Sequence, residues 1–420
     1  MSVFADIPQA APDVAFSLVA AYKEDPSDRK VDLCPGFYRD ENAEPWILPC
    51  VRKITNPPDI IRQAKDIIHA DPDLDHEHLP LLGHPGLLAG GRKMAFGPPS
   101  PADDHARIAS IQTVSGTGSN HLGARFLASS VLSGPGQTRS VWLPHPTWVN
   151  HPEIWALDAP AVAQRAYPYY DRERRALDRD GLLRTLARDA RKGDVVVLHA
   201  CAHNPTGLDP GRELWVEIGR ICQERGLFVL FDSAYQGFAT GSLDDDAFAI
   251  RHFLGRRMEF AVAQSFSKNL GLYGERVGAL HVVAADAGTA RRVEGSLARM
   301  SRAEVSTCPS YGARIAAAVL GSDELYAQWL RDLGTMSSRI MGMRRRLHGE
   351  LVRRETPGSW GHLLTDIGMF SMTGLSREQC TVLKDRYHVY LLPSGRMSFT
   401  GLTGRNVGHV AEAIDQVVRE

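Results

Sequence analysis

Six short runs of apolar residues recur between residues 108 and 283, and helix-like segments separate several of them. Valine, leucine, isoleucine and phenylalanine dominate these runs, which span residues 108–114, 141–143, 194–200, 227–232, 260–266 and 277–283. Unbroken apolar runs are typical of strands buried on both faces, and their alternation with helices favours parallel strands. We therefore expect an α/β fold with a mostly parallel sheet covered by helices.

The pattern changes beyond about residue 312, which indicates a second, smaller α/β domain. Residues 312–354 predict two long amphipathic helices, and a closing helix is predicted over 406–420. Short strand-like pieces lie between them, at 367–374 and 395–401. We predict that residues 1–45 form an N-terminal arm and part of the small domain, 46–320 the large domain and 321–420 the small C-terminal domain.

The charge and cysteine content exclude several classes of protein. A formal net charge of −1 over 420 residues provides no basic surface for nucleic acid or an anionic membrane. No run of about 18 apolar residues predicts a membrane-spanning helix. The six cysteines are irregularly spaced, and the first residues lack the basic start and apolar core of a signal peptide. We expect a soluble cytoplasmic protein with neither a nucleic-acid nor a membrane partner.

Polar clusters directly follow four of the predicted strands. They are SGTG at 115–118, CAHNPTG at 201–207, DSAY at 232–235 and QSFSKN at 264–269. Because ligands of open α/β sheets bind beyond the carboxyl ends of the strands, this placement indicates a ligand site.

Two of these clusters contain residues suited to a carbonyl cofactor. Lys268 follows a buried strand between hydroxyl residues and is a candidate Schiff-base nucleophile. Asp232 ends another strand and is a candidate partner for a protonated pyridine nitrogen. Read alone, a lysine is more often a surface residue, and a strand-end aspartate is more often a cap or turn residue.

Other residues suit anionic groups. The turn from Ser115 to Gly118 leads from a strand into a helix, where free N–H groups bind phosphate, and Arg276 is a candidate cationic partner. Arg396 has the fork geometry that binds a carboxylate. The local sequence is equally compatible with a surface ion pair for Arg276 and an ordinary strand-start arginine for Arg396. Two groups of metal-type donors, 75–78 and 199–203, lack the spacing of familiar zinc sites, so we predict no metal.

The order and wording of several segments carry a family resemblance. These segments are QTVSGTG, HPTWVNH, HACAHNPTGLDP, FDSAYQGFATG, AQSFSKNLGLYGERVG and DIGMFSMTGL, with VDLCPGFYRDENAEPWILPCVRK nearer the start. Together they resemble the aspartate aminotransferase branch of the class I pyridoxal-phosphate-dependent aminotransferases, from about residue 12 to the C-terminus. The resemblance implies a seven-stranded, mostly parallel sheet in the large domain. It also implies pyridoxal 5′-phosphate as cofactor and a homodimer with shared active sites.

The resemblance implies a role for each matching residue. Lys268, Asp232 and Tyr235 would be catalytic: Lys268 would bind the cofactor as a Schiff base and shuttle a proton, and Asp232 would contact the ring nitrogen. Trp148 would stack on the ring, Tyr235 and Asn204 would contact its 3′-oxygen, and His199 would lie behind Asp232. The cofactor phosphate would be held by Ser115, Gly116, Thr117, Ser265 and Arg276. The substrate would contact Arg396 through its α-carboxylate, together with Gly36, Trp148, Asn204 and Phe370.

Departures from the family pattern affect the residues that face the substrate and the second subunit. His78 stands where the family has a tyrosine that reaches the neighbouring subunit's phosphate. Alignment puts Arg302 in the place of the arginine that reads the substrate's distal carboxylate. Ser306-Thr307-Cys308-Pro309 replaces an SNPP-like string, Cys34-Pro35 precedes Gly36, and Val149 replaces a glycine.

Three functions follow as hypotheses. The leading one is an aminotransferase that moves an amino group between an acidic or aromatic amino acid and a 2-oxo acid. The first alternative is a lyase or carbon–carbon-forming enzyme of specialised metabolism, acting by elimination or replacement on a substrate such as S-adenosylmethionine. The second is a non-catalytic binding protein, against which the presence of Lys268, Asp232 and Arg396 together argues.

Overall fold

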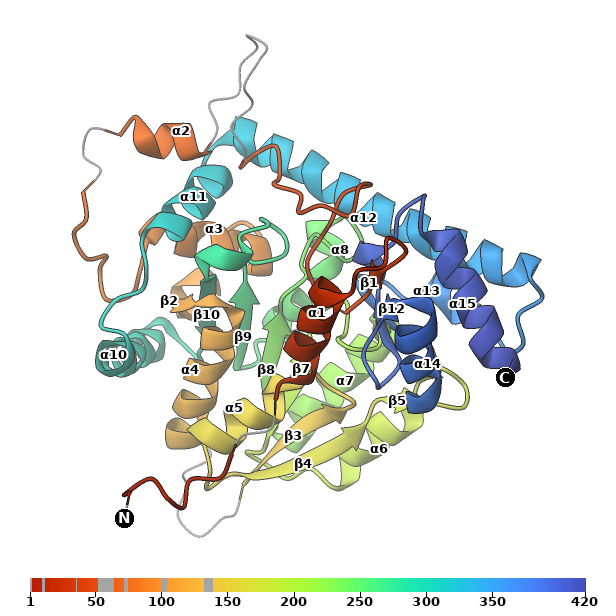
Figure 1. Ribbon diagram of the computed structural model, residues 1–420. Coiled ribbons are helices and arrows are strands. Elements are labelled where there is room, and N and C mark those ends of the chain that lie inside the picture. The colour runs from red at the N-terminus through yellow and green to blue at the C-terminus, as the bar shows by residue number, and fades with distance from the viewer. Residues whose placement is uncertain are drawn as a thin grey trace.

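The computed structural model describes residues 2–9, 12–34, 36–51, 64–71, 75–99, 104–131 and 139–420. Pro35, which the sequence comparison singled out, lies outside these residues. A seven-stranded sheet lies at the centre and helices cover it (Figure 1). No helix in the described ranges is long and apolar enough to cross a membrane.

The central sheet confirms the expected α/β fold class. Its strand order is β2-β10-β9-β8-β7-β3-β4, and only β10 runs antiparallel to its neighbours. The strands are β2 (Ile108–Val114), β3 (Ser140–His145), β4 (Ala163–Pro168), β7 (Val195–His199), β8 (Phe228–Ser233), β9 (Phe260–Ser265) and β10 (Val277–Val283). Six of them coincide with the six predicted runs. The edge strand β4 was not predicted, because its mostly exposed residues form no apolar run.

Both faces of the sheet are buried, as the unbroken apolar runs indicated. Along β7, Val195 and Val197 belong to one hydrophobic cluster and Val196 and Leu198 to another. The first face is covered by α4 (Ser115–Ser130), α5 (Asn150–Asp158) and α10 (Ala287–Glu304). The second is covered by α6 (Arg179–Arg188), α7 (Arg212–Arg225) and α9 (Phe248–Gly255). Alternate side chains therefore enter opposite layers, which is the period of a strand.

The chain beyond residue 310 is mainly helical. Its elements are α11 (Tyr311–Gly321), α12 (Asp323–Arg353), α13 (His362–Thr365), β11 (Phe370–Met372), α14 (Arg377–Tyr387), β12 (Val389–Tyr390), β13 (Arg396–Ser398) and α15 (Val407–Arg419). The two long helices and the closing helix match the predicted ones. β11 pairs with β13, and β12 pairs with β1 (Val31–Asp32). The segment after α1 (Val14–Glu24) is thereby joined to the C-terminal part of the chain.

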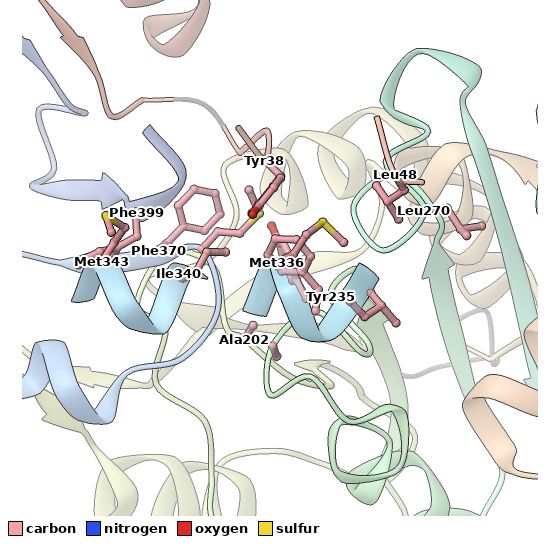
Figure 2. Close-up of a cluster of buried hydrophobic side chains, with 14 of the residues drawn as sticks. Tyr38, Leu48, Ala202, Tyr235, Leu270, Met336, Ile340, Met343, Phe370 and Phe399 are labelled. Carbon is pink, nitrogen blue, oxygen red and sulfur yellow. The ribbon is translucent and has the colours of Figure 1, made fainter. Parts of the chain in front are cut away.

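The long helix α12 connects this part to the strand ends of the central sheet. Figure 2 shows Met336, Ile340 and Met343 of α12 in one buried cluster with Tyr235 and Phe370. Trp329 of the same helix donates its indole N–H to the Asn269 carbonyl at 2.7 Å. The remaining described α-helices are α2 (Ala64–His69), which packs against α11, α3 (Pro85–Phe96), which packs against α11 and the sheet, and α8 (Leu243–Asp246), which packs against α9.

Candidate functional site

The site is built where β7, β8 and β9 end. In the strand register His199 lies opposite Asp232, and Asp232 lies opposite Ala263. These strands are parallel, so their last residues and the loops after them meet at one edge of the sheet. The sequence clusters around Asn204, Asp232 and Lys268 are thus neighbours in space.

A chain of hydrogen bonds ends on the Asp232 carboxylate. The Asn204 N–H donates to His199 Nδ1 at 3.5 Å, and His199 Nε2 lies 3.3 Å from Thr147 Oγ1. Thr147 Oγ1 is 2.8 Å from His151 Nδ1, and His151 Nε2 is 3.0 Å from Asp232 Oδ2. Since each neutral imidazole has one donor and one acceptor nitrogen, every link is satisfied when all donors point toward Asp232.

The electrostatics of this chain keep Asp232 ionised. Burial would raise the pKa of Asp232, but the His151 hydrogen bond and the nearby His151, His199 and Lys268 lower the pKa below its ordinary value. Burial, together with the charges of His203 and His151, holds the pKa of His199 well below its usual range. These shifts favour an ionised carboxylate at Asp232 and a neutral imidazole at His199.

Lys268 follows β9 and lies within the electrostatic reach of Asp232. Its Nζ is 5.3 Å from the centre of the Tyr235 ring, and it makes no hydrogen bond with the described residues. Burial lowers the pKa of the Lys268 ammonium, Asp232 opposes this shift, and Arg276 and Arg396 add to it. A lowered pKa increases the fraction of neutral amine, which is the nucleophilic form.

A cradle for an anion lies at the start of α4. Ser115 Oγ accepts from the Thr117 N–H at 3.2 Å and from Arg276 Nη2 at 2.7 Å. Ser115 and Arg276 both have left-handed backbone angles, with φ of 68° and 54°. A Cβ atom at Gly116 would lie 2.6 Å from Ser265 Cβ, so only glycine leaves this space open. Free N–H groups of a helix start beside a guanidinium suit a phosphate.

Arg396, the first residue of β13, supplies a second guanidinium. Its Nη1 donates to Asn204 Oδ1 at 3.3 Å and its Nη2 donates to the Cys34 carbonyl at 2.6 Å. Its Nε is buried without a partner among the described residues. The guanidinium lies 4.2 Å from the centre of the Phe370 ring. These contacts hold the fork in place while leaving a donor available.

Three further predicted residues border the same space. A Cβ atom at Gly36 would lie 2.9 Å from Phe370 Cζ, so this glycine permits close packing of the ring. Tyr235 and Phe370 contact edge to face at 6.4 Å, and both appear in Figure 2. Trp148 is half-buried, and its ring contacts the His151 ring edge to face with 5.3 Å between the ring centres.

Two predicted residues lie elsewhere. His78 is exposed, and its Nδ1 is 3.0 Å from Thr307 Oγ1. Arg302 is exposed in the last turn of α10 and hydrogen-bonds Ser306. Neither contacts Lys268 or Asp232 of its own chain. They do share one surface, since Ser306 and Thr307 are adjacent residues.

The sequence reasoning missed His151 and Thr147. Both lie in the segment HPTWVNH, of which only Trp148 and Val149 were given individual attention. The spacing from Thr147 to His151 is one helical turn, which was the only available signal that the two side chains meet.

These features fit a phosphorylated pyridine aldehyde. An amine without a hydrogen bond, a buried carboxylate and an anion cradle around Gly116 would hold its aldehyde, its ring nitrogen and its phosphate. Within the described ranges, no group of three or more histidine, cysteine, aspartate or glutamate side chains is arranged to hold a metal.

Comparison with known proteins gives a consistent result. Residues 28–414 match the model of the family "Aminotransferase class I and II". The chain is 43% identical to a cytoplasmic aspartate aminotransferase of Schizosaccharomyces pombe, covering 99% of this chain and 98% of that protein. It is 42% identical to an L-tyrosine:2-oxoglutarate aminotransferase of Aspergillus ustus, covering 99% and 78%. The structure of an aromatic-amino-acid aminotransferase from Burkholderia pseudomallei, covalently bound to pyridoxal phosphate, superposes with a TM-score of 0.92 at 33% identity and full coverage of both chains.

Proposed function

The chain belongs to the class I and II aminotransferases, and from this premise we propose that it moves an amino group between an acidic or aromatic amino acid and a 2-oxo acid. The observation that carries this proposal is the placement of half-buried Lys268 within electrostatic reach of buried Asp232, at adjacent strand ends. The cofactor is pyridoxal 5′-phosphate. When bound, it supplies an aldehyde that exchanges with amines and a ring that withdraws electrons from the substrate α-carbon.

The residues around the cofactor have separate tasks in this proposal. Lys268 Nζ would hold the cofactor aldehyde, and its lowered pKa favours the neutral amine that can take a proton from the substrate α-carbon. Asp232 would pair with the ring nitrogen, and the His151 hydrogen bond favours its ionised form. Tyr235 and Asn204 would bind the ring oxygen, and Trp148 would stack on the ring. Ser115, Gly116, Thr117, Ser265 and Arg276 would hold the phosphate.

Arg396 binds the substrate α-carboxylate. Its orientation is fixed by Asn204, by the Cys34 carbonyl and by the Phe370 ring. A fixed guanidinium loses little conformational entropy when the substrate arrives, which favours binding of a planar carboxylate. Gly36 and Phe370 form the adjoining wall, and burial excludes water from the reacting atoms.

We propose a cytoplasmic homodimer in which each active site is completed by the other subunit. His78 and Arg302 lie together on an exposed surface of their own chain. This placement suits residues that act on the partner's site, where His78 would reach the phosphate and Arg302 a distal carboxylate. The division into an arm at 1–45, a large domain at 46–320 and a small domain at 321–420 remains part of the proposal.

The alternative functions are less well supported. The matching family model describes aminotransferases, and the similar proteins named above are aspartate, tyrosine and aromatic-amino-acid aminotransferases. They favour transamination over elimination or carbon–carbon bond formation. A purely binding role leaves the lowered pKa of Lys268 without a purpose.

Absorbance spectroscopy of the purified protein tests the proposal. The protein should be yellow, and addition of aspartate, glutamate or tyrosine should convert the aldehyde form of the cofactor to the amine form. Lys268→Ala should abolish this conversion, whereas substitution of Lys384, a half-buried lysine of α14, by alanine should not. Failure of all proteinogenic amino acids to convert the cofactor would contradict the proposed reaction.

A further inference from the structure

One histidine joins the ends of two helices to the middle of a third. His121 Nδ1 lies 2.6 Å from Asp158 Oδ2, and His121 Nε2 lies 3.0 Å from Glu304 Oε2. The side chains of Asp158 and Glu304 are only 14% and 17% exposed, and that of His121 is 34% exposed. Arg125, one turn further along α4, pairs with the other oxygen of Glu304 at 2.7 Å.

Both ring nitrogens of His121 face a carboxylate oxygen, so the ring bridges the ends of two helices. An ionised carboxylate only accepts hydrogen bonds, and a ring that donates from both nitrogens satisfies both contacts. Asp158 is the last residue of α5 and Glu304 the last residue of α10. The negative ends of two helix dipoles thus meet at this ring, and each favours a cation there. The charged groups facing His121 are these two carboxylates, with Arg125 beyond one of them.

Each of the three helices carries a different part of the proposed site. α4 begins at the phosphate cradle around Gly116, and α5 begins beside Trp148 and contains His151. α10 carries Arg302 in its last turn, two residues before Glu304. Figure 1 shows α10 and α5 against α4, and side chains from all three helices share one hydrophobic cluster.

The end of α10 has few other restraints. Ser301 is buried, but Arg302 and Ala303 are exposed. After Glu304 the chain is held by His78 at Thr307 and by the Cys308 Sγ contact to the Gln112 carbonyl at 3.3 Å. Arg302 itself hydrogen-bonds Ser306, just beyond the helix, and the His121 and Arg125 pairs tie the last residue of α10 to α4.

We propose that His121, through its contacts to Asp158 and Glu304, is a positioning residue that fixes the end of α10 and thereby the direction in which Arg302 is presented. Selection of dicarboxylate over aromatic substrates then depends on a residue that touches neither substrate nor cofactor. This second statement rests on the proposed role of Arg302, whereas the restraint on α10 does not.

The test compares His121→Leu, His121→Arg and Arg125→Leu in the cofactor-loaded protein. Leucine removes both hydrogen bonds, while arginine can donate to both carboxylates. Arg125→Leu is the matched control, because it removes a cation from Glu304 but leaves the His121 bridge. Hydrogen–deuterium exchange of residues 298–308 should become at least about fivefold faster in His121→Leu and remain near wild type in His121→Arg. It should change clearly less in Arg125→Leu, because the Arg125 side chain is 47% exposed and its ion pair is weaker. Thermal unfolding establishes that each variant is folded.

Steady-state kinetics give the second readout. His121→Leu should raise KM for dicarboxylate substrates roughly five- to tenfold, with kcat and the KM for aromatic substrates little changed, and His121→Arg should restore the wild-type ratio. Unchanged exchange in His121→Leu, or an equal effect of Arg125→Leu, would overturn the positioning role. Faster exchange with an unchanged KM ratio would overturn the link to substrate choice. Arg302→Ala tests the proposed role of Arg302 separately. If this variant raises KM equally for dicarboxylate and aromatic substrates, Arg302 does not read a distal carboxylate. The exchange data still decide whether His121 positions the end of α10.

Discussion

Replacing His151 with leucine tests whether the hydrogen-bond chain keeps Asp232 ionised. His151 and Asp232 expose only 1% and 8% of their surfaces, and His151 Nε2 lies 3.0 Å from Asp232 Oδ2. A hydrogen bond to a charged group contributes roughly 1.5–3 kcal/mol. Because leucine leaves the buried carboxylate without this donor, the free energy of unfolding near neutral pH should fall by about that amount.

A double-mutant cycle isolates the interaction from the loss of packing. Urea unfolding of wild type, His151→Leu, Asp232→Asn and the double variant, at one protein concentration and without cofactor, gives the coupling energy. We expect a coupling of at least ~1 kcal/mol, since residues in one hydrogen-bond network are rarely additive. Additivity within about 0.3 kcal/mol would refute the reasoning.

The pH dependence gives an independent check. Burial raises the pKa of Asp232, yet the His151 hydrogen bond and the neighbouring charges lower it overall. A carboxyl group with a lowered folded-state pKa stabilises the protein above its unfolded pKa of about 3.9, and this stabilisation is lost as the pH falls through the folded-state pKa. The penalty of His151→Leu should therefore be largest at neutral pH and shrink in acid. An equal penalty at neutral and acidic pH would count against the argument.

Three further substitutions test the anion cradle, the carboxylate-binding arginine and a buried arginine of α12. Gly116→Ala should weaken cofactor binding and stability by roughly 1–3 kcal/mol, because the new Cβ would collide with Ser265 of β9. Gly118→Ala should be tolerated, since the atom nearest to its new Cβ lies at 3.6 Å. Equilibrium dialysis of the cofactor against each variant measures the difference. Arg396→Lys should raise KM for every amino acid roughly 10- to 100-fold, because the fork geometry is lost, and a change confined to one substrate class would be contrary to its role. Arg344 is fully buried and donates to the Gly368 carbonyl at 2.9 Å, so Arg344→Met should lower the free energy of unfolding by ~2 kcal/mol or more, whereas the exposed neighbouring Arg345→Met should change it by less than about 0.5 kcal/mol.

The local sequence was sufficient to predict an element where burial alone determined its composition. The runs 108–114 and 277–283 coincide with β2 and β10 residue for residue, because strands buried on both faces must be apolar throughout. The amphipathic stretch from about residue 312 predicted α11 and α12, because the buried face of each helix must be apolar. The edge strand β4 escaped prediction because one of its sides faces solvent and allows polar residues.

The local sequence could not predict that β10 runs antiparallel to its neighbours. Its apolar run is indistinguishable from those of the parallel strands, since burial sets composition while the connecting chain sets direction. The same applies to the surroundings of Arg396. Its motif predicted a carboxylate ligand, but nothing in the motif indicated the Cys34 carbonyl, 362 residues away, that holds Nη2.

The sequence by itself determined which side chains end the buried strands, and hence that Lys268, Asp232 and the Ser115 turn lie at one edge of a sheet. Tertiary structure alone decided their surroundings and orientation, through His151 behind Asp232, the contacts of His121 with two helix ends, and the carbonyl that holds Arg396. The reason is physical. Burial leaves a trace in local composition, whereas a pKa or a hydrogen-bond direction depends on groups that only the folded chain brings within a few ångströms.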